Sequence, residues 1–375
     1  LQGVLNKDYQ SNEGLRPKNY NTYQIFQKDD LVFKMIDLEN VRTSRVGLVH
    51  EEGIMSPVYL RHEPIQEKIN PKFAYWFYYD LYNKEIYNSV GSGVRSSLSS
   101  SDLLEIELPV PPIEDQKLIS RYLDKKTGQI NSLVEKIHDK IELLKEKRTL
   151  LINYYVTKGL NSDVEMKCSG IDWVGDIPSH WATIKPKYIL NRVTRPIDDD
   201  DEVVTCFRDG VVTLRKNRRE DGFTFANKEH GYQQIRPGDL VVHEMDGFAG
   251  AIGISDSKGK STPVYTVVEP DSKTNLKFVA YLLRVMSHTG KIESLARSIR
   301  ERTTDFRWNM WSVIHFPFPQ VEEQILIAEK LDEETNKVDK LINLYKEKID
   351  KLLEYSQSLT SSVTTGKLRI TEDMI

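Results

Sequence analysis

The side chains best suited to chemistry in this chain are cations that gather in two runs. The denser run lies between β-like segments and consists of Arg215, Lys216, Asn217, Arg218 and Arg219. The second run precedes a helical segment and contains Arg297, Arg300, Arg302 and Arg307. Arginine and asparagine pair bidentately with guanine and adenine edges in the major groove of DNA. Both runs therefore predict DNA contacts, and a solvated loop is the alternative for the first run.

The first hundred residues offer a more scattered set of candidates. Arg95 and Ser96 stand in the stretch GSGVRSSLSSSD, where Gly91 and Gly93 permit a close approach of the backbone. Weaker candidates are Lys7, Tyr9, Gln10, Arg16, Lys18, Asn19, Arg42 and Arg45. Many such contacts should go to phosphates, which position a protein on DNA without specifying the sequence.

Catalytic motifs are weak or missing. Asn70-Pro71-Lys72-Phe73 is faintly similar to the Asn-Pro-Pro-Tyr/Phe loop of adenine methyltransferases, but Lys72 replaces the second proline, and the segment is more typical of a helix start. The glycine motif at residues 248–253 (FAGAIG) lacks the strand-loop-helix context of a cofactor site and reads as a strand with small residues. His243 and Glu244 have no second cluster of metal ligands nearby, and no GxxxxGK[ST] phosphate loop occurs. We expect no catalytic residue, no metal and no cofactor bound by this chain.

Composition narrows the class of protein. The formal net charge is −4, and residues 181–315 carry 21 Lys and Arg against 18 Asp and Glu. Any nucleic-acid binding must therefore depend on local basic loops or on partner subunits. No run approaches 18 apolar residues, the N-terminus lacks a signal pattern, and Cys168 and Cys206 are too few for a disulfide framework. A cytoplasmic setting is the expectation.

An internal repeat must position these residues. The segment beginning at Leu108 aligns without a gap to the segment beginning at Phe316, at an offset of 208 residues. Matched pairs include Pro111/Pro319, Gln116/Gln324, Leu123/Leu331, Asp124/Asp332 and Thr127/Thr335. Such a protein has two equivalent halves and suits a target with two halves.

Each repeat copy carries the heptad seam of a coiled coil. The seam positions are Ile130, Val134, Ile137, Ile141 and Leu144 in the first copy, and Val338, Ile342, Tyr345, Ile349 and Leu352 in the second. About 44 residues give a rod of roughly 65 Å. The simplest partner for each helix is the other copy, packed antiparallel, and dimerisation with another molecule is the alternative. Arg148 and Ser356 interrupt the two seams at the same place, either to fix the register or because the helix end frays.

The segments before each helix predict a different kind of structure. Short β-like runs at residues 30–36 (DLVFKMI) and 239–245 (DLVVHEM) precede helical stretches at residues 71–87 and 276–288. The expected fold class is α/β with α+β heads: two globular domains separated by two long helices with pseudo-two-fold symmetry. The expected boundaries are a first head at 1–107, a helix at 108–160, a linker at 161–180, a second head at 181–315, a helix at 316–368 and a tail at 369–375. By the repeat offset, the first head would need roughly 28 residues before Leu1 and is expected to be N-terminally incomplete.

The junctions PVPPIEDQKLI and PFPQVEEQILI resemble the junction motif of the specificity (S) subunit of type I restriction-modification systems. The linker from Val156 to Trp181, VTKGLNSDVEMKCSGIDWVGDIPSHW, resembles the connector to that family's second target-recognition domain. The resemblance covers essentially the whole chain, whereas the heads match only in outline.

The resemblance implies a non-catalytic subunit in which each target-recognition domain reads half of a bipartite DNA site in the major groove. The coiled coil would set the spacer and dock partner subunits. The implied partners are double-stranded DNA, two methyltransferase subunits and motor-nuclease subunits, with no membrane. S-adenosylmethionine, ATP and Mg²⁺ would then belong to the partner subunits. The alternative is a non-catalytic coiled-coil scaffold with two protein-binding heads.

Overall fold

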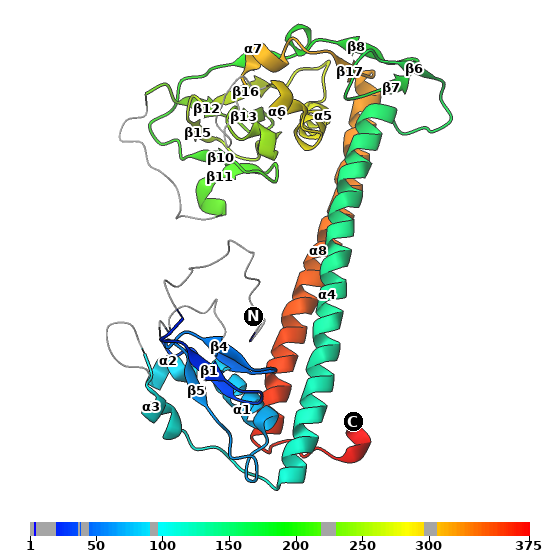
Figure 1. The fold of residues 1–375 in the computed structure, drawn as a ribbon. Helices are drawn as coiled ribbons and strands as arrows, with labels where there is room; N and C mark the ends of the chain where they lie inside the picture. The colour runs from blue at the N-terminus through cyan, green and yellow to red at the C-terminus, as the bar shows by residue number, and fades with distance from the viewer. Residues whose placement is uncertain are drawn as a thin grey trace. The chain divides into compact units, whose positions relative to one another are not determined.

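The computed structural model describes residues 4, 20–36, 38, 45–90, 97–218, 230–295 and 306–375 (Figure 1). The chain divides into two compact units. Unit 1 is Leu1–Asp139 with Leu344–Ile375, and unit 2 is Lys140–Asn343. Each unit therefore holds one head together with a segment of both long helices.

The two repeat copies form the long helices α4 (Ile113–Lys158) and α8 (Val321–Thr364). Each helix begins after its proline-rich junction. Before α8 the junction is extended, since residues 316–318 form strand β17 (Phe316–Phe318). Acidic residues occupy both first turns, Glu114 and Asp115 in α4 and Glu322 and Glu323 in α8, where they complement the helix dipole.

The helices pack antiparallel within the chain. In unit 1 the start of α4 shares a buried cluster with the end of α8, through Leu118, Leu123 and Val363. In unit 2 the end of α4 shares a buried cluster with the start of α8, through Val156 and Leu331. Every predicted seam residue is buried or half-buried. The predicted intramolecular antiparallel coiled coil is confirmed.

The head of unit 1 is a small antiparallel assembly. Strand β2 (Leu31–Phe33) lies between β3 (Val46–Leu48) and β5 (Leu60–His62), and β1 (Gln24–Phe26) pairs with β4 (Gly53–Met55). Helix α1 (Pro71–Asn83) contacts β3, and α2 (Ile86–Val90) and α3 (Ser100–Leu104) follow. The core between strands and helices includes Phe33, Leu48, Ala74 and Leu103.

The head of unit 2 repeats this plan with more strands. The central sheet runs β14 (Ile252–Ile254), β13 (Leu240–His243), β16 (Tyr265–Glu269) and β9 (Asn191–Val193). Two further antiparallel pairs are β10 (Val204–Cys206) with β11 (Val212–Leu214), and β12 (Gln233–Ile235) with β15 (Gly259–Ser261). Helix α5 (Leu276–His288) contacts β14 and β13, and α6 (Lys291–Leu295) and α7 (Trp308–Trp311) follow. The connection that leads into this head contains the strands β6 (Met166–Cys168), β7 (Asp176–Pro178) and β8 (Ala182–Ile184). Short 3₁₀ turns lie at η1 (Pro186–Tyr188), η2 (Arg215–Asn217), η3 (Gly247–Ala249) and η4 (Glu372–Met374).

A buried carboxylate stands before the central strand of each head. Asp30 precedes β2 and Asp239 precedes β13, and their relative exposures are 2% and 1%. Each accepts a hydrogen bond from a backbone N–H three residues earlier, that of Gln27 or Arg236. Each also binds an arginine, but the cation comes from different places: Arg61 lies in β5, whereas Arg195 follows β9. The two heads therefore share the acid and supply its counter-ion differently.

Across the part of the chain that the structure describes, no helix is long and apolar enough to cross a membrane.

Candidate nucleic-acid interface

The first predicted basic run forms the turn η2, directly after β11. Two of its side chains are fastened to the strands beneath it. Arg215 Nε donates to Thr205 Oγ1 at 3.3 Å, and Asn217 Nδ2 donates to Thr213 Oγ1 at 2.8 Å. The run is therefore held on the β10–β11 pair, which orients Arg215.

The other two described cations of the run pair with acids of the same head. Arg218 lies 2.7 Å from Asp209 and stacks over the ring of Phe207 at 4.7 Å, and the hydrogen bond that Arg218 donates to Asp209 raises the pKa of Arg218. Lys216 pairs with Glu202. Arg219 lies outside the described residues. The run is thus a partnered surface in which Arg218 is 37% exposed and Lys216 is 55% exposed.

A cleft of about 770 Å³ opens beside this turn in unit 2. Its walls come from residues 203–209, from Arg215 and Arg218, from His243 and Asp246 after β13, and from Thr262 and Tyr265 before and in β16. Its two acids already bind cations, since Asp209 pairs with Arg218 and Asp246 with Arg208. The hydroxyl of Thr262 is buried and has no hydrogen-bond partner among the described residues. The cleft is therefore rich in hydrogen-bond donors.

His243 contributes a donor of fixed orientation to the cleft. Its Nδ1 accepts from the backbone N–H groups of Met245 at 3.2 Å and Asp246 at 3.0 Å, so the ring proton must lie on Nε2. Burial lowers the pKa of His243, which keeps the ring neutral. The ring also packs edge-on against Tyr265, with centroids 4.5 Å apart.

Arg208 is a cleft residue that the sequence did not single out. It is 66% exposed and lies 3.0 Å from Asp246. A single arginine in the sequence FRDG does not form a basic run, so composition alone could not mark it as a candidate for DNA contact. The turn signal at Asp209-Gly210, where Gly210 adopts a φ of 89°, is the feature that could have located it beside a loop.

The second predicted basic run is described only at Arg307. Its Nε lies 4.0 Å from Glu244 Oε2, and the side chain is 63% exposed. Arg307 does not line the cleft, although its partner Glu244 directly follows His243. Arg297, Arg300 and Arg302 lie outside the described residues.

In the first head, Arg45 does not fit a DNA contact, contrary to the sequence-based expectation. Its relative exposure is 2%, and its Nη1 donates to the carbonyls of Ile36 at 2.9 Å and Lys34 at 3.4 Å. The guanidinium thus binds the backbone of residues 34–36, directly after β2. Nine further candidates lie outside the described residues: Lys7, Tyr9, Gln10, Arg16, Lys18, Asn19, Arg42, Arg95 and Ser96.

The two segments that resembled enzyme motifs are local structure. Asn70 caps α1, since its side chain accepts from the backbone N–H of Phe73 at 3.1 Å and Pro71 opens the helix. The predicted helix start is confirmed there. The glycine motif was expected to be one strand, and this is wrong in part: residues 247–249 form the turn η3 before β14 begins at Ile252. Gly250 between them adopts a φ of 90°, which breaks the strand.

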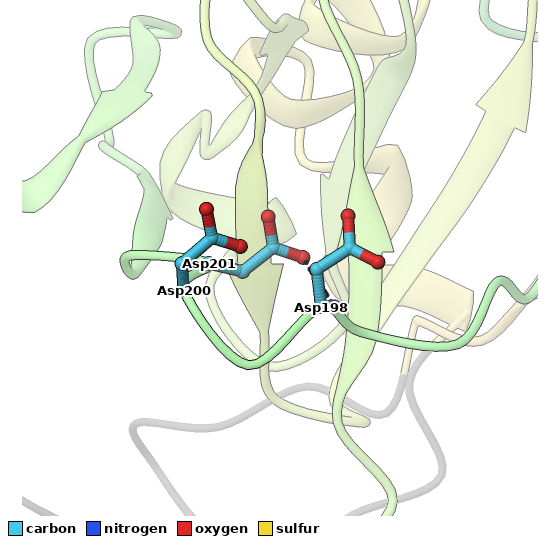
Figure 2. Close-up of side chains that lie close together, drawn as sticks. All are labelled: Asp198, Asp200 and Asp201. Carbon is cyan, nitrogen blue, oxygen red and sulfur yellow. Dashed lines mark hydrogen bonds between the residues drawn. The ribbon is translucent and has the colours of Figure 1, made fainter.

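Three aspartates gather on one loop of unit 2 (Figure 2). Carboxylate oxygens of Asp198, Asp200 and Asp201 lie within 4.8 Å of one another. Lys258 lies 2.6 Å from Asp198, and Gln234 donates to both Asp198 and Asp201 at 2.9 and 3.0 Å. Asp201 also accepts the backbone N–H of Asp198 at 2.9 Å. These bonds tie the loop to β12 through Asp198 and Asp201.

Comparisons with known proteins point to one family. The family described as Type I restriction modification DNA specificity domain matches residues 4–143. The chain is 24% identical over 337 residues to the Type I restriction enzyme MjaVIII specificity subunit of Methanocaldococcus jannaschii, which covers 85% of this chain and 75% of that protein. It is 22% identical over 349 residues to the Type I restriction enzyme EcoBI specificity subunit of Escherichia coli, with coverages of 85% and 70%.

A solved structure shares the fold. It is described as the structural basis underlying complex assembly and conformational transition of the type I R-M system. It aligns with a TM-score of 0.67 at 15% identity, over 94% of this chain and 85% of that chain. The likeness supports the arrangement of α+β heads and paired long helices.

Proposed function

The chain belongs to the family of specificity subunits of type I restriction-modification systems, and we propose that it reads a bipartite DNA sequence through its two heads. The observation that carries this proposal is the donor-rich cleft of unit 2. Arg208, Arg215 and Arg218 line it together with the fixed Nε2–H of His243. The N7 and O6 atoms of guanine and the O4 atom of thymine are acceptors in the major groove, so such a cleft suits base edges.

The internal repeat supports a second reader in unit 1. Both heads present a central strand after a buried aspartate and join their long helix through matching residues. Two readers joined by paired helices would select two short motifs separated by a fixed gap. The antiparallel coiled coil would set that gap, since the seam positions of both copies are buried or half-buried.

Methylation and cleavage of the DNA would belong to partner subunits. Methyltransferase subunits would dock on the helices and carry S-adenosylmethionine, and motor-nuclease subunits would carry ATP and Mg²⁺. The role of this chain is to bind and orient DNA. Its own cleft residues would supply the hydrogen bonds and charges for that role.

The test compares cleft variants with a neighbour outside the cleft. We expect Arg215→Gln and Arg208→Gln, each assembled with the methyltransferase subunit, to lose about 1–3 kcal/mol of affinity for the selected site. The matched control is Lys216→Gln, because Lys216 adjoins Arg215 in sequence but does not line the cleft. Loss confined to one half-site supports base reading. Equal loss on all sequences would mark phosphate contacts, and no loss from either variant would remove the cleft from the interface.

A further inference from the structure

We infer that unit 1 carries an open docking site for an extended peptide segment led by a tryptophan, of the kind that residues 181–184 form in unit 2. The inference comes from the internal repeat, because one surface at the start of the long helix is covered in unit 2 and exposed in unit 1. The donor-rich cleft belongs to unit 2, so this inference is independent of DNA reading.

In unit 2 a strand covers the junction before α8. Strand β8 pairs antiparallel with β17, with Ile184 opposite Phe316 and Ala182 opposite Phe318 (Figure 1). Phe316 is 1% exposed beneath this pairing, and Pro317 is buried. The connection that leads into the second head therefore also closes the proline-rich junction.

The tryptophan ahead of β8 anchors that strand. Trp181 is 1% exposed, and its Nε1 donates to Glu323 of α8 at 3.1 Å. Its ring lies against Gly159, which directly follows α4: a Cβ added to this glycine would fall 3.2 Å from Trp181 Cζ2. Gly159 has a φ of 77°, a conformation that also favours glycine. Trp181 thus fixes β8 between the end of α4 and the start of α8.

The matching strand edge is open in unit 1. By the repeat, Leu108–Val110 occupy the positions of Phe316–Phe318, and no described strand pairs with them. Val110 is 58% exposed, and Pro109 is exposed where Pro317 is buried. An exposed extended edge with apolar side chains is a place where another strand can add.

The place of the tryptophan is open as well. Gly366 ends the motif VTTG, which matches VTKG at Gly159. It is exposed with a φ of 74°, and a Cβ added to it would meet no described atom within 4 Å. Asp115 matches Glu323 and is exposed, so its carboxylate is available to accept from an indole N–H. Leu108–Val110, Asp115 and Gly366 make up the docking site.

The C-terminal tail of unit 1 lies on another face of α4. Leu368 and Ile370 of the tail pack in one cluster with Leu118, and Glu372 lies 2.9 Å from Arg121. Leu118 is 9% exposed in this cluster. The tail therefore does not fill the docking site, whose residues stay exposed in its presence.

The repeat specifies the chemistry of the occupant. A peptide with the pattern Trp-Ala-Thr-Ile would place its strand beside Leu108–Val110, its ring at Gly366 and its indole N–H at Asp115. Backbone hydrogen bonds to the edge would give affinity, and the buried tryptophan would give much of the specificity. We assign a separate peptide segment as the occupant, because a second copy of the chain would have to release its own β8 from β17 to supply one.

The test titrates the full chain with a synthetic peptide of residues 176–187, DIPSHWATIKPK, and follows binding by titration calorimetry. We expect saturable binding. Trp181→Ala in the peptide should weaken it about tenfold or more, since a buried tryptophan carries much of the energy of such an interface. No binding of the unaltered peptide would overturn the inference.

Variants of the full chain locate the bound peptide. Val110→Arg would leave a charge beneath the added strand and should weaken binding about tenfold. The control Val58→Arg changes a valine that is 44% exposed in the same head and should bind as the wild type does. Asp115→Asn should weaken binding, whereas Asp115→Glu, which copies the carboxylate of unit 2, should preserve it. Circular dichroism checks that each variant is folded.

Two outcomes would contradict the site. Binding that Val110→Arg leaves unchanged would mean that the peptide exchanges with β8 in unit 2. Sedimentation of the chain without peptide tests the other occupant. A dimer that Val110→Arg dissociates would show that a second copy covers this face, and a monomer that binds the peptide supports the assignment.

Discussion

Gln116 and Gln324 make the same two hydrogen bonds in the two units, although they lie 208 residues apart in the sequence. Gln116 Oε1 accepts from the backbone N–H of Asn70 at 2.7 Å, and its Nε2 donates to the carbonyl of Pro111 at 2.7 Å. Gln324 Oε1 accepts from Asn275 at 2.9 Å, and its Nε2 donates to Pro319 at 2.9 Å. Both side chains are 0% exposed. Each amide therefore joins the cap of a head helix to the proline junction of a long helix.

A second pair of contacts repeats about two turns further along each long helix, at Asp124 and Asp332. Lys72 binds Asp124 and Lys277 binds Asp332, both at 2.6 Å. The other carboxylate oxygen accepts from Trp76 Nε1 at 3.0 Å in unit 1 and from Tyr281 Oη at 2.8 Å in unit 2. Both units therefore use an aspartate of the long helix at this point, but its aromatic donor is a tryptophan in one unit and a tyrosine in the other. The head is joined to its long helix in both units although the donor differs.

Removing this amide should destabilise the unit that contains it. We expect Gln116→Leu to lower the free energy of unfolding by about 2 kcal/mol, because the Asn70 N–H and the carbonyls of Pro111 and Lys68 would lose their hydrogen bonds to the amide. Urea titration measures the change. The control is Gln129→Leu, at an exposed position of the same helix. Equal effects of the two variants would contradict the proposed role of the amide.

The buried ion pair of the second head should matter more than a surface pair. Arg195 lies 2.6 Å from Asp239, and the side chains are 13% and 1% exposed. Arg195→Met leaves the carboxylate buried without its cation, so we expect a loss of about 3 kcal/mol in urea unfolding. Lys258→Met, which removes the exposed pair with Asp198, should change stability little. A small effect of Arg195→Met would show that the hydrogen bond from the backbone N–H of Arg236 is enough to stabilise the buried carboxylate of Asp239.

Substitutions in the coiled-coil seam should destabilise the protein according to how deeply the side chain is buried, and not according to its hydrophobicity alone. Ile342 is 7% exposed at a seam position, whereas Leu344 is 59% exposed two residues later. Ile342→Ala should cost about 2–4 kcal/mol of unfolding free energy, because it opens a cavity in the seam. Leu344→Ala should change it far less. Similar losses would mean that Leu344 is covered by another molecule under the conditions used.

Acid should weaken the fold through histidines buried in a neutral form. Burial lowers the pKa of His62, His243 and His288 below the usual 6.5, with the charges of Arg284 and Arg148 adding to the effect at His288. Between that value and the folded pKa, the unfolded chain binds more protons, so stability falls as the pH drops below about 6.5. Urea unfolding at pH 5 and pH 7 measures the loss. His243→Asn should reduce the pH dependence, and an unchanged dependence would count against a buried neutral ring.

The long helices were predictable because their determinants are local and periodic. Ile137, Ile141 and Leu144 repeat at heptad spacing, and Val338 and Ile342 repeat it in the second copy, so sequence alone indicates which face is buried. The fold class follows from the same repeat. The residues at which the long helices begin depend on strand pairing outside them. The sequence did not reveal that Phe316–Phe318 pairs with β8 before α8 begins.

The cleft was only partly predictable, because its residues come from segments that are distant in sequence. Arg215 and Arg218 belong to a visible basic run, whereas Arg208 and His243 are single residues brought to the same cleft where the β10–β11 pair packs against β13. Arg45 shows the opposite error. A cation in a polar stretch suggested a surface contact, but tertiary packing buried it against backbone carbonyls.

Selection from random duplex DNA tests the central claim most directly. The full chain would be reconstituted with its methyltransferase subunit and the selection run at one stated salt concentration. Two short enriched motifs separated by a fixed, unspecified gap are the predicted result. Repeating it with Arg215→Gln should alter one motif and leave the other motif and the gap unchanged. No enrichment from a competent assembly would contradict DNA reading and favour a protein-binding scaffold.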